Sequence, residues 1–117
     1  MNVITVASLK GGVGKTTAAV HLALALQGAG KRVLAVDLDA NNNLTDFFLR
    51  SAAPEDIDSA GAYHVLARKL EITACVRKTP SGVDVLPGSP SLGRLSGELA
   101  ANPGPLLAFG PRLRKTA

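Results

Sequence analysis

Eight consecutive residues near the N-terminus combine glycine, lysine and threonine in a spacing that suits a bound phosphate group. Residues 10–17 read Lys-Gly-Gly-Val-Gly-Lys-Thr-Thr. A helix N-terminus presents unpaired backbone N–H groups and the positive end of the helix dipole, and glycines let the chain wrap around an anion. At the start of such a helix, Lys15 can reach the β- and γ-phosphates of a nucleotide and the Thr16 hydroxyl can ligate Mg²⁺. The stretch predicts a nucleotide-binding loop, and the alternative is a glycine-rich turn with two exposed lysines.

This loop departs from the common pattern G-x-x-x-x-G-K-[ST]. The first glycine of that pattern would fall on position 9, which is Leu9 here, and Lys10 precedes a glycine pair instead. Seven specified residue types in eight positions arise by chance at a given site with a probability on the order of 10⁻⁸, judged from average residue usage. We therefore interpret the stretch as a variant phosphate-binding loop.

The segments around the loop indicate a strand, a helix and a second strand. Residues 2–7 are an apolar, β-branched run that is typical of a buried parallel strand, and residues 16–27 are rich in helix-forming Ala and Leu before a glycine-rich stop. Residues 32–38 are apolar up to their carboxyl end. Such strands join through a right-handed crossover. We expect an α/β fold with both strands in one parallel sheet and the helix across its face.

Signals are weaker beyond Asp39. The predicted elements are two helices and two short strands, at residues 44–50, 59–70, 72–76 and 83–86. From Pro80 to the end, 12 of 38 residues are Gly or Pro. Because these residues interrupt regular structure, we expect short helices and loops there, in the least well packed part of the chain.

Composition limits the class of protein. The 117 residues are 46% hydrophobic and 19% charged, which indicates one soluble globular domain or part of one. No apolar run approaches the ~20 residues needed to span a bilayer, and the N-terminus lacks the basic region of a signal peptide. The one cysteine cannot form an internal disulfide. These features predict a cytoplasmic protein without a transmembrane segment.

Charge is uneven along the chain, with a net −1 over residues 1–60 and +5 over residues 61–117. The basic half could face nucleic acid or an acidic partner; a solvated surface is the alternative, because the basic residues lack interleaved aromatics for base stacking. Cys75, His21 and His64 are expected to be packed residues without a catalytic role.

The loop resembles the deviant Walker A loop of the ParA/MinD/Soj family of P-loop ATPases, which position cargo such as plasmids, chromosomes and division sites. In that family the second strand ends in the pattern D-x-D-P-Q-G-N-x-T, in the place of residues 37–45 here. The positions that agree are Asp37, Asp39, Asn43 and Thr45, and those that depart are Ala40, Asn41 and Asn42. Residues 82–88 also resemble the family's strand that ends in a proline.

The resemblance is strong over residues 1–50, faint to about residue 100 and absent over 101–117. It implies the N-terminal part of a single ParA-like ATPase domain, with a truncated P-loop NTPase-type parallel sheet flanked by helices.

The resemblance implies a role for each residue of the loop. Lys15 would bind the β- and γ-phosphates and Thr16 the Mg²⁺. Lys10 would be the signature lysine that reaches the partner's nucleotide across an ATP-sandwiched dimer. The remaining phosphate oxygens would be held by Thr17 and by the backbone of Gly11, Gly12, Val13 and Gly14.

The resemblance also implies roles for two aspartates. Asp39 would orient the attacking water, and Asp37 would contact Mg²⁺ through water. For both residues the alternative is a helix cap at a solvated strand end.

At the level of the whole protein, the resemblance implies an ATPase switch for plasmid or chromosome partitioning or cellular positioning. It would use ATP and Mg²⁺, form an ATP-dependent homodimer, and contact non-specific DNA and a ParB-like partner protein. A complete ATPase of this group is roughly twice this length. No apolar strand ending in aspartate, the Walker B element, follows Leu86. The alternative is therefore a catalytically inactive truncated remnant, or a non-catalytic nucleotide- or partner-binding module.

Overall fold

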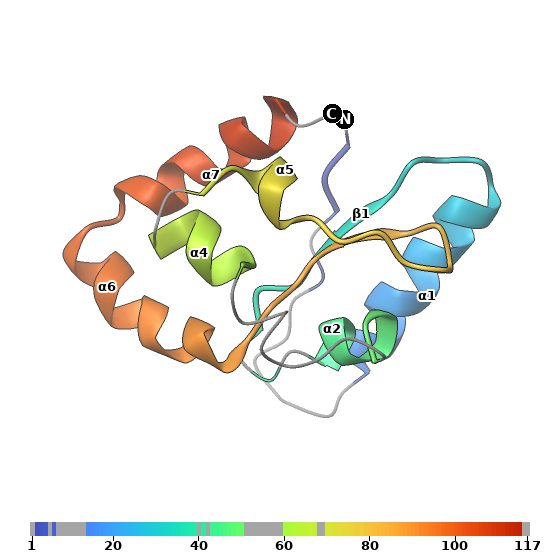
Figure 1. The fold of residues 1–117 in the computed structure, drawn as a ribbon, viewed down its shortest axis with the longest axis horizontal. Helices are drawn as coiled ribbons and strands as arrows, with labels where there is room; N and C mark the ends of the chain where they lie inside the picture. The colour runs from blue at the N-terminus through green and yellow to red at the C-terminus, as the bar shows by residue number, and fades with distance from the viewer. Residues whose placement is uncertain are drawn as a thin grey trace.

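Two short parallel strands form the centre of the fold. In the computed structural model of the chain, β1 (Leu34–Val36) pairs with β2 (Asp84–Leu86), and Ala35 lies opposite Val85. Helices lie on both sides of this pair (Figure 1). The predicted α/β class, with a parallel sheet flanked by helices, is confirmed. The residues that the structure describes are 2–4, 6, 14–39, 41, 43–50, 60–67 and 70–115.

Apolar side chains cover both faces of the strand pair. On one face, Ala35 and Val85 pack against α1 (Lys15–Gly28) and α2 (Asn43–Phe48). On the other face, Leu86 joins a second apolar cluster formed by the remaining helices. Because water is excluded from both faces, the strands are apolar at nearly every position, as parallel strands usually are.

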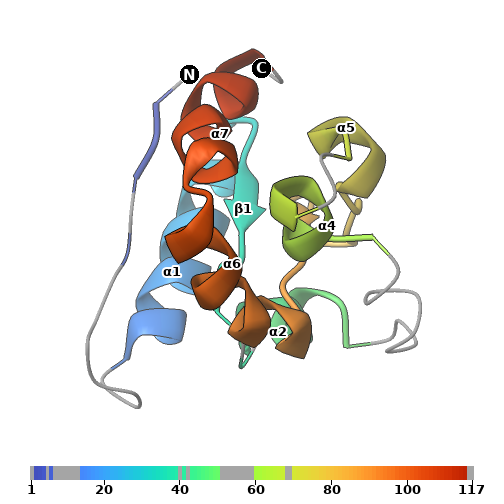
Figure 2. The ribbon, with the colours of Figure 1, turned by 90° about the vertical axis from the view of Figure 1, so that its left-hand side faces the viewer.

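The second layer consists of helical segments from the middle and the end of the chain. Figures 1 and 2 show them grouped on the side of the sheet away from α1 and α2. They are α4 (Ala62–Ala67), α5 (Ile72–Cys75), the 3-10 helix η1 (Pro90–Arg94), α6 (Leu95–Ala101) and α7 (Gly104–Lys115). Among the helices of the described residues, none reaches the length and hydropathy that crossing a bilayer requires.

Helix α1 confirms the prediction over residues 16–27. It ends where Gly30 adopts a left-handed conformation, with φ 86°. The Lys31 N–H donates to the Leu26 carbonyl at 3.1 Å and the Gly30 N–H donates to the Gln27 carbonyl at 3.0 Å. Such bonds satisfy carbonyls that the helix end would leave unpaired, and the left-handed residue favours glycine.

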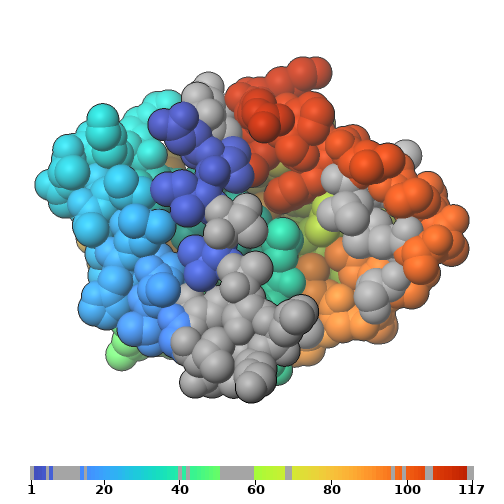
Figure 3. Space-filling view, turned by 180° about the vertical axis from the view of Figure 1, so that it is seen from behind, coloured from blue at the N-terminus to red at the C-terminus, as the bar shows by residue number. Residues whose placement is uncertain are grey.

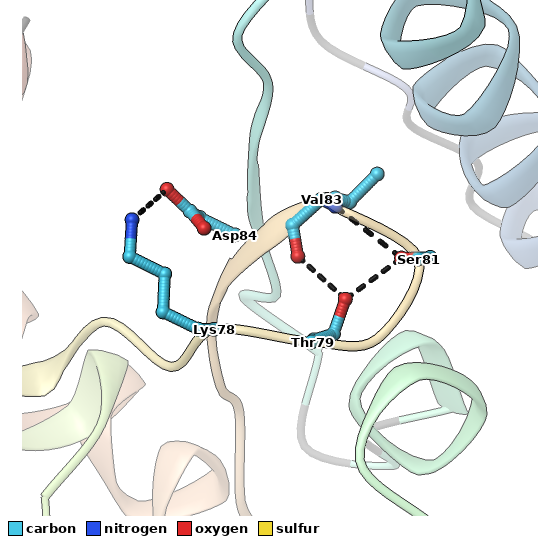
Figure 4. A network of polar contacts seen from close by, with 5 residues as sticks. All are labelled: Lys78, Thr79, Ser81, Val83 and Asp84. Atoms are coloured by element: carbon cyan, nitrogen blue, oxygen red, sulfur yellow. Dashed lines mark hydrogen bonds and ion pairs between the residues drawn. The ribbon is translucent and has the colours of Figure 1, made fainter.

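A tight turn leads into β2, which confirms the predicted strand over residues 83–86. The Thr79 hydroxyl donates to the Val83 carbonyl at 2.7 Å and lies 2.7 Å from the Ser81 hydroxyl. Lys78 forms an exposed ion pair with Asp84 at 2.8 Å (Figure 4). These contacts turn the chain back so that β2 begins in register with β1.

The predicted strand over residues 2–7 is not found at its described residues. Residues 2–4 and 6 are not in a strand, and Val3, Ile4 and Val6 are 54%, 59% and 37% exposed. Figure 3 shows the described N-terminal residues, in dark blue, on the surface between α1 and α7. A strand needs a paired neighbour, and among the described residues β1 pairs with β2 instead.

The prediction of a strand over residues 72–76 is wrong, because Ile72–Cys75 forms helix α5. Ile72 is 3% exposed and Cys75 is fully buried, while the two residues between them are exposed. A spacing of three residues puts both side chains on one helix face. Packing of that face against α4 outweighs the preference of β-branched residues for strands.

The expectation that the chain after Pro80 packs least well is also wrong. Residues 85–89 are buried at every position, and α7 extends over 12 residues despite Pro111 within it. The Arg112 guanidinium donates to the carbonyls of Val65 and Leu70, which fastens α7 to the segment around α4. Glycine and proline counts describe local preference, whereas these contacts come from distant residues.

Burial protects Cys75, as predicted for a small core residue. Desolvation raises the pKa of the Cys75 thiol, and the nearby positive charges of Arg77 and Arg112 oppose that rise only in part. Since the thiolate is the reactive form, a raised pKa and a buried sulfur both slow its reactions.

We expect the native chain to react with Ellman's reagent at pH 8 at least about tenfold more slowly than the urea-unfolded chain. Absorbance at 412 nm follows the reaction, and free cysteine serves as the control for reagent quality. Equal rates in the native and unfolded chains would show that α5 does not stay packed on α4.

Candidate functional site

The start of α1 has the backbone geometry that the predicted loop requires. Gly14 precedes the helix with φ 84°, a left-handed conformation that favours glycine. Its carbonyl accepts the Ala18 N–H at 2.8 Å, the first hydrogen bond of the helix. The first N–H groups of a helix have no partner within it, so they are available to an anion. Thr16 is half-buried and Thr17 is exposed beside them.

The remaining predicted loop residues lie outside the part of the chain that the structure describes. These are Lys10, Gly11, Gly12 and Val13, together with the side chain of Lys15. Their roles stay predictions.

The Asp-x-Asp segment lies directly after β1. The Asp37 N–H donates to the Leu86 carbonyl at 3.0 Å, which continues the strand pairing by one residue. The Asp37 side chain is only 4% exposed. Its Oδ1 accepts the Asp39 N–H at 3.0 Å, and its Oδ2 accepts both the N–H and the hydroxyl of Thr45, at 3.0 and 2.6 Å.

Thr45 lies in the first turn of α2 and is fully buried. Besides donating its hydroxyl to Asp37, it accepts the Gly88 N–H on Oγ1 at 2.8 Å. One hydroxyl therefore joins the end of β1 to the segment that follows β2. Sequence patterns single out Thr45 and the range 82–88 that contains Gly88, but they predict no role for either residue, because nothing in the sequence brings the two together.

Only glycine fits at position 88, because the backbone there lies close to Asp37 and Asp39. A Cβ at this position would lie 2.9 Å from the Asp37 carbonyl oxygen, 3.0 Å from Asp37 Cγ and 3.1 Å from the Asp39 carbonyl oxygen. Any side chain would therefore push the Asp-x-Asp segment out of place. The segment that contains Gly88 is also bound to α4, because the Ala62 N–H at the start of that helix donates to the Pro87 carbonyl at 2.8 Å.

Asp39 lies two residues further along and is half-buried. Its Oδ1 accepts the Asn41 N–H at 2.9 Å. The structure thus brings Asp37 and Asp39 together at the carboxyl end of β1. The alternative for these aspartates was a helix cap at a solvated strand end. Asp37 does act in part as a helix cap, since it accepts an N–H from the first turn of α2. The end of β1 where it lies is buried, however, and not solvated.

The carboxylate of Asp37 is suited to an indirect metal contact. A carboxylate has about four acceptor positions, and donors from the described residues take three of them in Asp37, one at Oδ1 and two at Oδ2. Among the described residues, no group of three or more His, Cys, Asp and Glu side chains could hold a metal ion. The donor set around Asp37 therefore fits contact with a hydrated Mg²⁺ better than an all-protein metal cage.

The two histidines lie on helices, His21 on α1 and His64 on α4. His64 is half-buried in α4; its Nδ1 accepts the Gly61 N–H at 3.1 Å, and its ring packs edge-on against Tyr63. His21 is exposed on α1, so the expectation that it is packed was wrong.

Comparison with known proteins points to one family. The model of a protein family described as an AAA domain matches residues 1–115. The chromosome-partitioning ATPase Soj of Thermus thermophilus is 40% identical over 100 residues, which is 86% of this chain and 37% of that protein. The chromosome partitioning protein ParA of Caulobacter vibrioides is 33% identical over 100 residues, which is 85% of this chain and 36% of that protein.

Solved structures agree with these relatives. Cobyrinic acid a,c-diamide synthase from Mycobacterium smegmatis, with a bound ATP analogue and magnesium, superposes with a TM-score of 0.83 at 32% identity, over 94% of this chain and 44% of that one. A plasmid partition protein from Borrelia burgdorferi gives a TM-score of 0.67 at 26% identity, over 79% and 41%. The chain spans about a third of the length of the curated relatives named above. From the family match and these likenesses, the chain belongs to the ParA family of P-loop ATPases.

Proposed function

We propose that this chain carries the nucleotide-binding part of a ParA-like ATPase switch. The observation that carries the proposal is the start of α1, where left-handed Gly14 leads into Lys15, Thr16 and Thr17 at a helix N-terminus. The Asp37 and Asp39 carboxylates, held at the end of β1, support it. The solved relative from Mycobacterium smegmatis holds an ATP analogue and magnesium, which is the ligand pair proposed here.

In this proposal different residues bind the phosphates, the Mg²⁺ and the attacking water. Lys15, the α1 N–H groups, Thr17 and the backbone of residues 11–14 bind the phosphates, and the Thr16 hydroxyl is a ligand of Mg²⁺. Asp37 orients water on that ion, and Asp39 positions the attacking water. Bound Mg²⁺ would supply the positive charge that phosphoryl transfer requires.

The switch itself is a shift between two states. We propose that nucleotide binding favours a homodimer in which Lys10 of each chain reaches the nucleotide of the other, and that hydrolysis reverses the shift. A second cation near each triphosphate would reduce the repulsion between two nucleotide-bearing faces. The names of the relatives, chromosome-partitioning and plasmid partition proteins, support partitioning or positioning as the role. Non-specific DNA and a ParB-like protein are the partners that we propose for it.

The two lysines of the loop should separate binding from dimerisation. We expect Lys15→Ala to weaken binding of ATP with Mg²⁺ by roughly tenfold or more, because a charged hydrogen bond to the phosphates is lost. Lys10→Ala should leave that affinity within about twofold and weaken nucleotide-dependent dimerisation. Calorimetry measures the first quantity and sedimentation velocity the second.

Each lysine variant is the control for the other, since both remove one positive charge from the same loop. An equal loss of nucleotide affinity in the two would contradict the proposed division of labour.

For residues 1–117 alone, we expect ATP hydrolysis at the background rate. The reaction needs Lys15, an anchored Mg²⁺ and an aligned water together, and the sequence holds no apolar strand ending in aspartate after Leu86. Loss of one such electrostatic contact costs ~3–4 kcal/mol, or about 10²–10³ in rate. A phosphate-release assay makes the measurement, with Asp39→Ala as the control, which should match it. Robust turnover that Asp39→Ala removes would show that these residues suffice.

A further inference from the structure

The Thr45 hydroxyl makes two hydrogen bonds, and only one position of its proton allows both. The Gly88 backbone N–H must donate, so Thr45 Oγ1 accepts it at 2.8 Å. The hydroxyl proton is then left for Asp37 Oδ2, at 2.6 Å. Since Thr45 is fully buried and Asp37 is 4% exposed, water does not compete for either bond. A threonine or serine can both donate and accept in this way, whereas valine, of the same shape, can do neither.

These bonds fix a carboxylate that the proposed function places beside Mg²⁺. Thr45 supplies two of the three hydrogen bonds to Asp37, and the third comes from the Asp39 N–H. Gly88 limits the space around this carboxylate, because its backbone lies so near that an added Cβ would be 3.0 Å from Asp37 Cγ. The orientation of the Asp37 carboxylate therefore depends on Thr45 and Gly88. The position of Asp39 depends on them in turn, because its N–H donates to Asp37.

We infer that Thr45 is a positioning residue for the Mg²⁺ side of the site, and that it ties the Asp37 carboxylate to the segment after β2 through Gly88. The inference rests on the proposed function, since it assumes that Asp37 serves Mg²⁺-nucleotide binding. Residues that orient metal-contacting carboxylates typically change metal affinity by about 10–100-fold when mutated. A purely structural threonine would change stability and leave the dependence on Mg²⁺ as it was.

The decisive measurement is the affinity of a fluorescent ATP analogue (mant-ATP) as a function of Mg²⁺ concentration, with an EDTA sample as the metal-free reference. For Thr45→Val we expect the Mg²⁺ midpoint to rise roughly tenfold while the affinity in EDTA stays within about twofold of wild type. Thr45→Ser restores the hydroxyl and should bring the midpoint back to within about threefold.

Thr79→Val is the matched control. Thr79, like Thr45, donates its hydroxyl proton in a hydrogen bond, but its acceptor is the Val83 carbonyl in the turn before β2 and not a carboxylate of the site (Figure 4). It should leave the Mg²⁺ midpoint unchanged even if it lowers the melting temperature.

Gly88→Ala adds a Cβ beside the Asp37 carboxylate and should raise the midpoint as Thr45→Val does. Circular dichroism checks that each variant folds, and Gly88→Ala decides the question if Thr45→Val does not.

The possible results distinguish failure of the proposed nucleotide binding from failure of the proposed role of Thr45. A wild-type chain that does not bind mant-ATP with or without Mg²⁺ would overturn the proposed function, and this inference with it. A wild-type chain with Mg²⁺-dependent binding, combined with an unchanged midpoint in the folded Thr45→Val or Gly88→Ala variant, would overturn only the role of Thr45. So would a Thr45→Ser variant as impaired as Thr45→Val, or an equal shift in Thr79→Val.

Discussion

A buried carboxylate imposes the strictest requirement in this structure. Removing a charged group from water costs several kcal/mol unless hydrogen bonds replace its hydration. Asp37 meets that requirement with three donors, one from Asp39 and two from Thr45. These donors are in place only when the chain after β1 folds back and α2 begins where it does. The geometry of the candidate site therefore follows from the need to satisfy one side chain.

The parallel strand pair makes this arrangement possible by placing the chain after β2 beside the chain after β1. Two arginines fasten the helical layer that supports it. The Arg77 backbone bridges to Val85 on the edge of β2 that faces away from β1, and its guanidinium donates to the carbonyls of Ala60 and Cys75. Arg112 does the same for α7 and the segment around α4. The same layer contacts the residue before Gly88, because the Ala62 N–H at the start of α4 donates to the Pro87 carbonyl.

Sequence reasoning succeeded where local preference and tertiary structure agree. Helix α1 combines strong helix formers with a glycine stop, and both strands are apolar runs that need burial on two faces. It failed where distant contacts decide. Residues 72–75 are helical because their spacing buries Ile72 and Cys75 against α4, and the segment after Pro80 is well packed because distant helices cover it. The apolar run at 2–7 has no strand at its described residues, since a strand depends on a neighbour that the run itself does not specify.

By itself the sequence determined the chemistry available to this protein: a glycine- and lysine-rich loop before a helix, and two aspartates after an apolar strand. Those features are local, so residue types and short spacings are enough to recognise them. Only the tertiary structure decided that β1 pairs with β2, and that Thr45 and Gly88 enclose the Asp37 carboxylate. Gly88 lies 43 residues beyond the threonine that binds it. Glycine is needed there because its backbone lies close to Asp37 and donates to the Thr45 hydroxyl. Such contacts between distant segments depend on the packing of the whole fold.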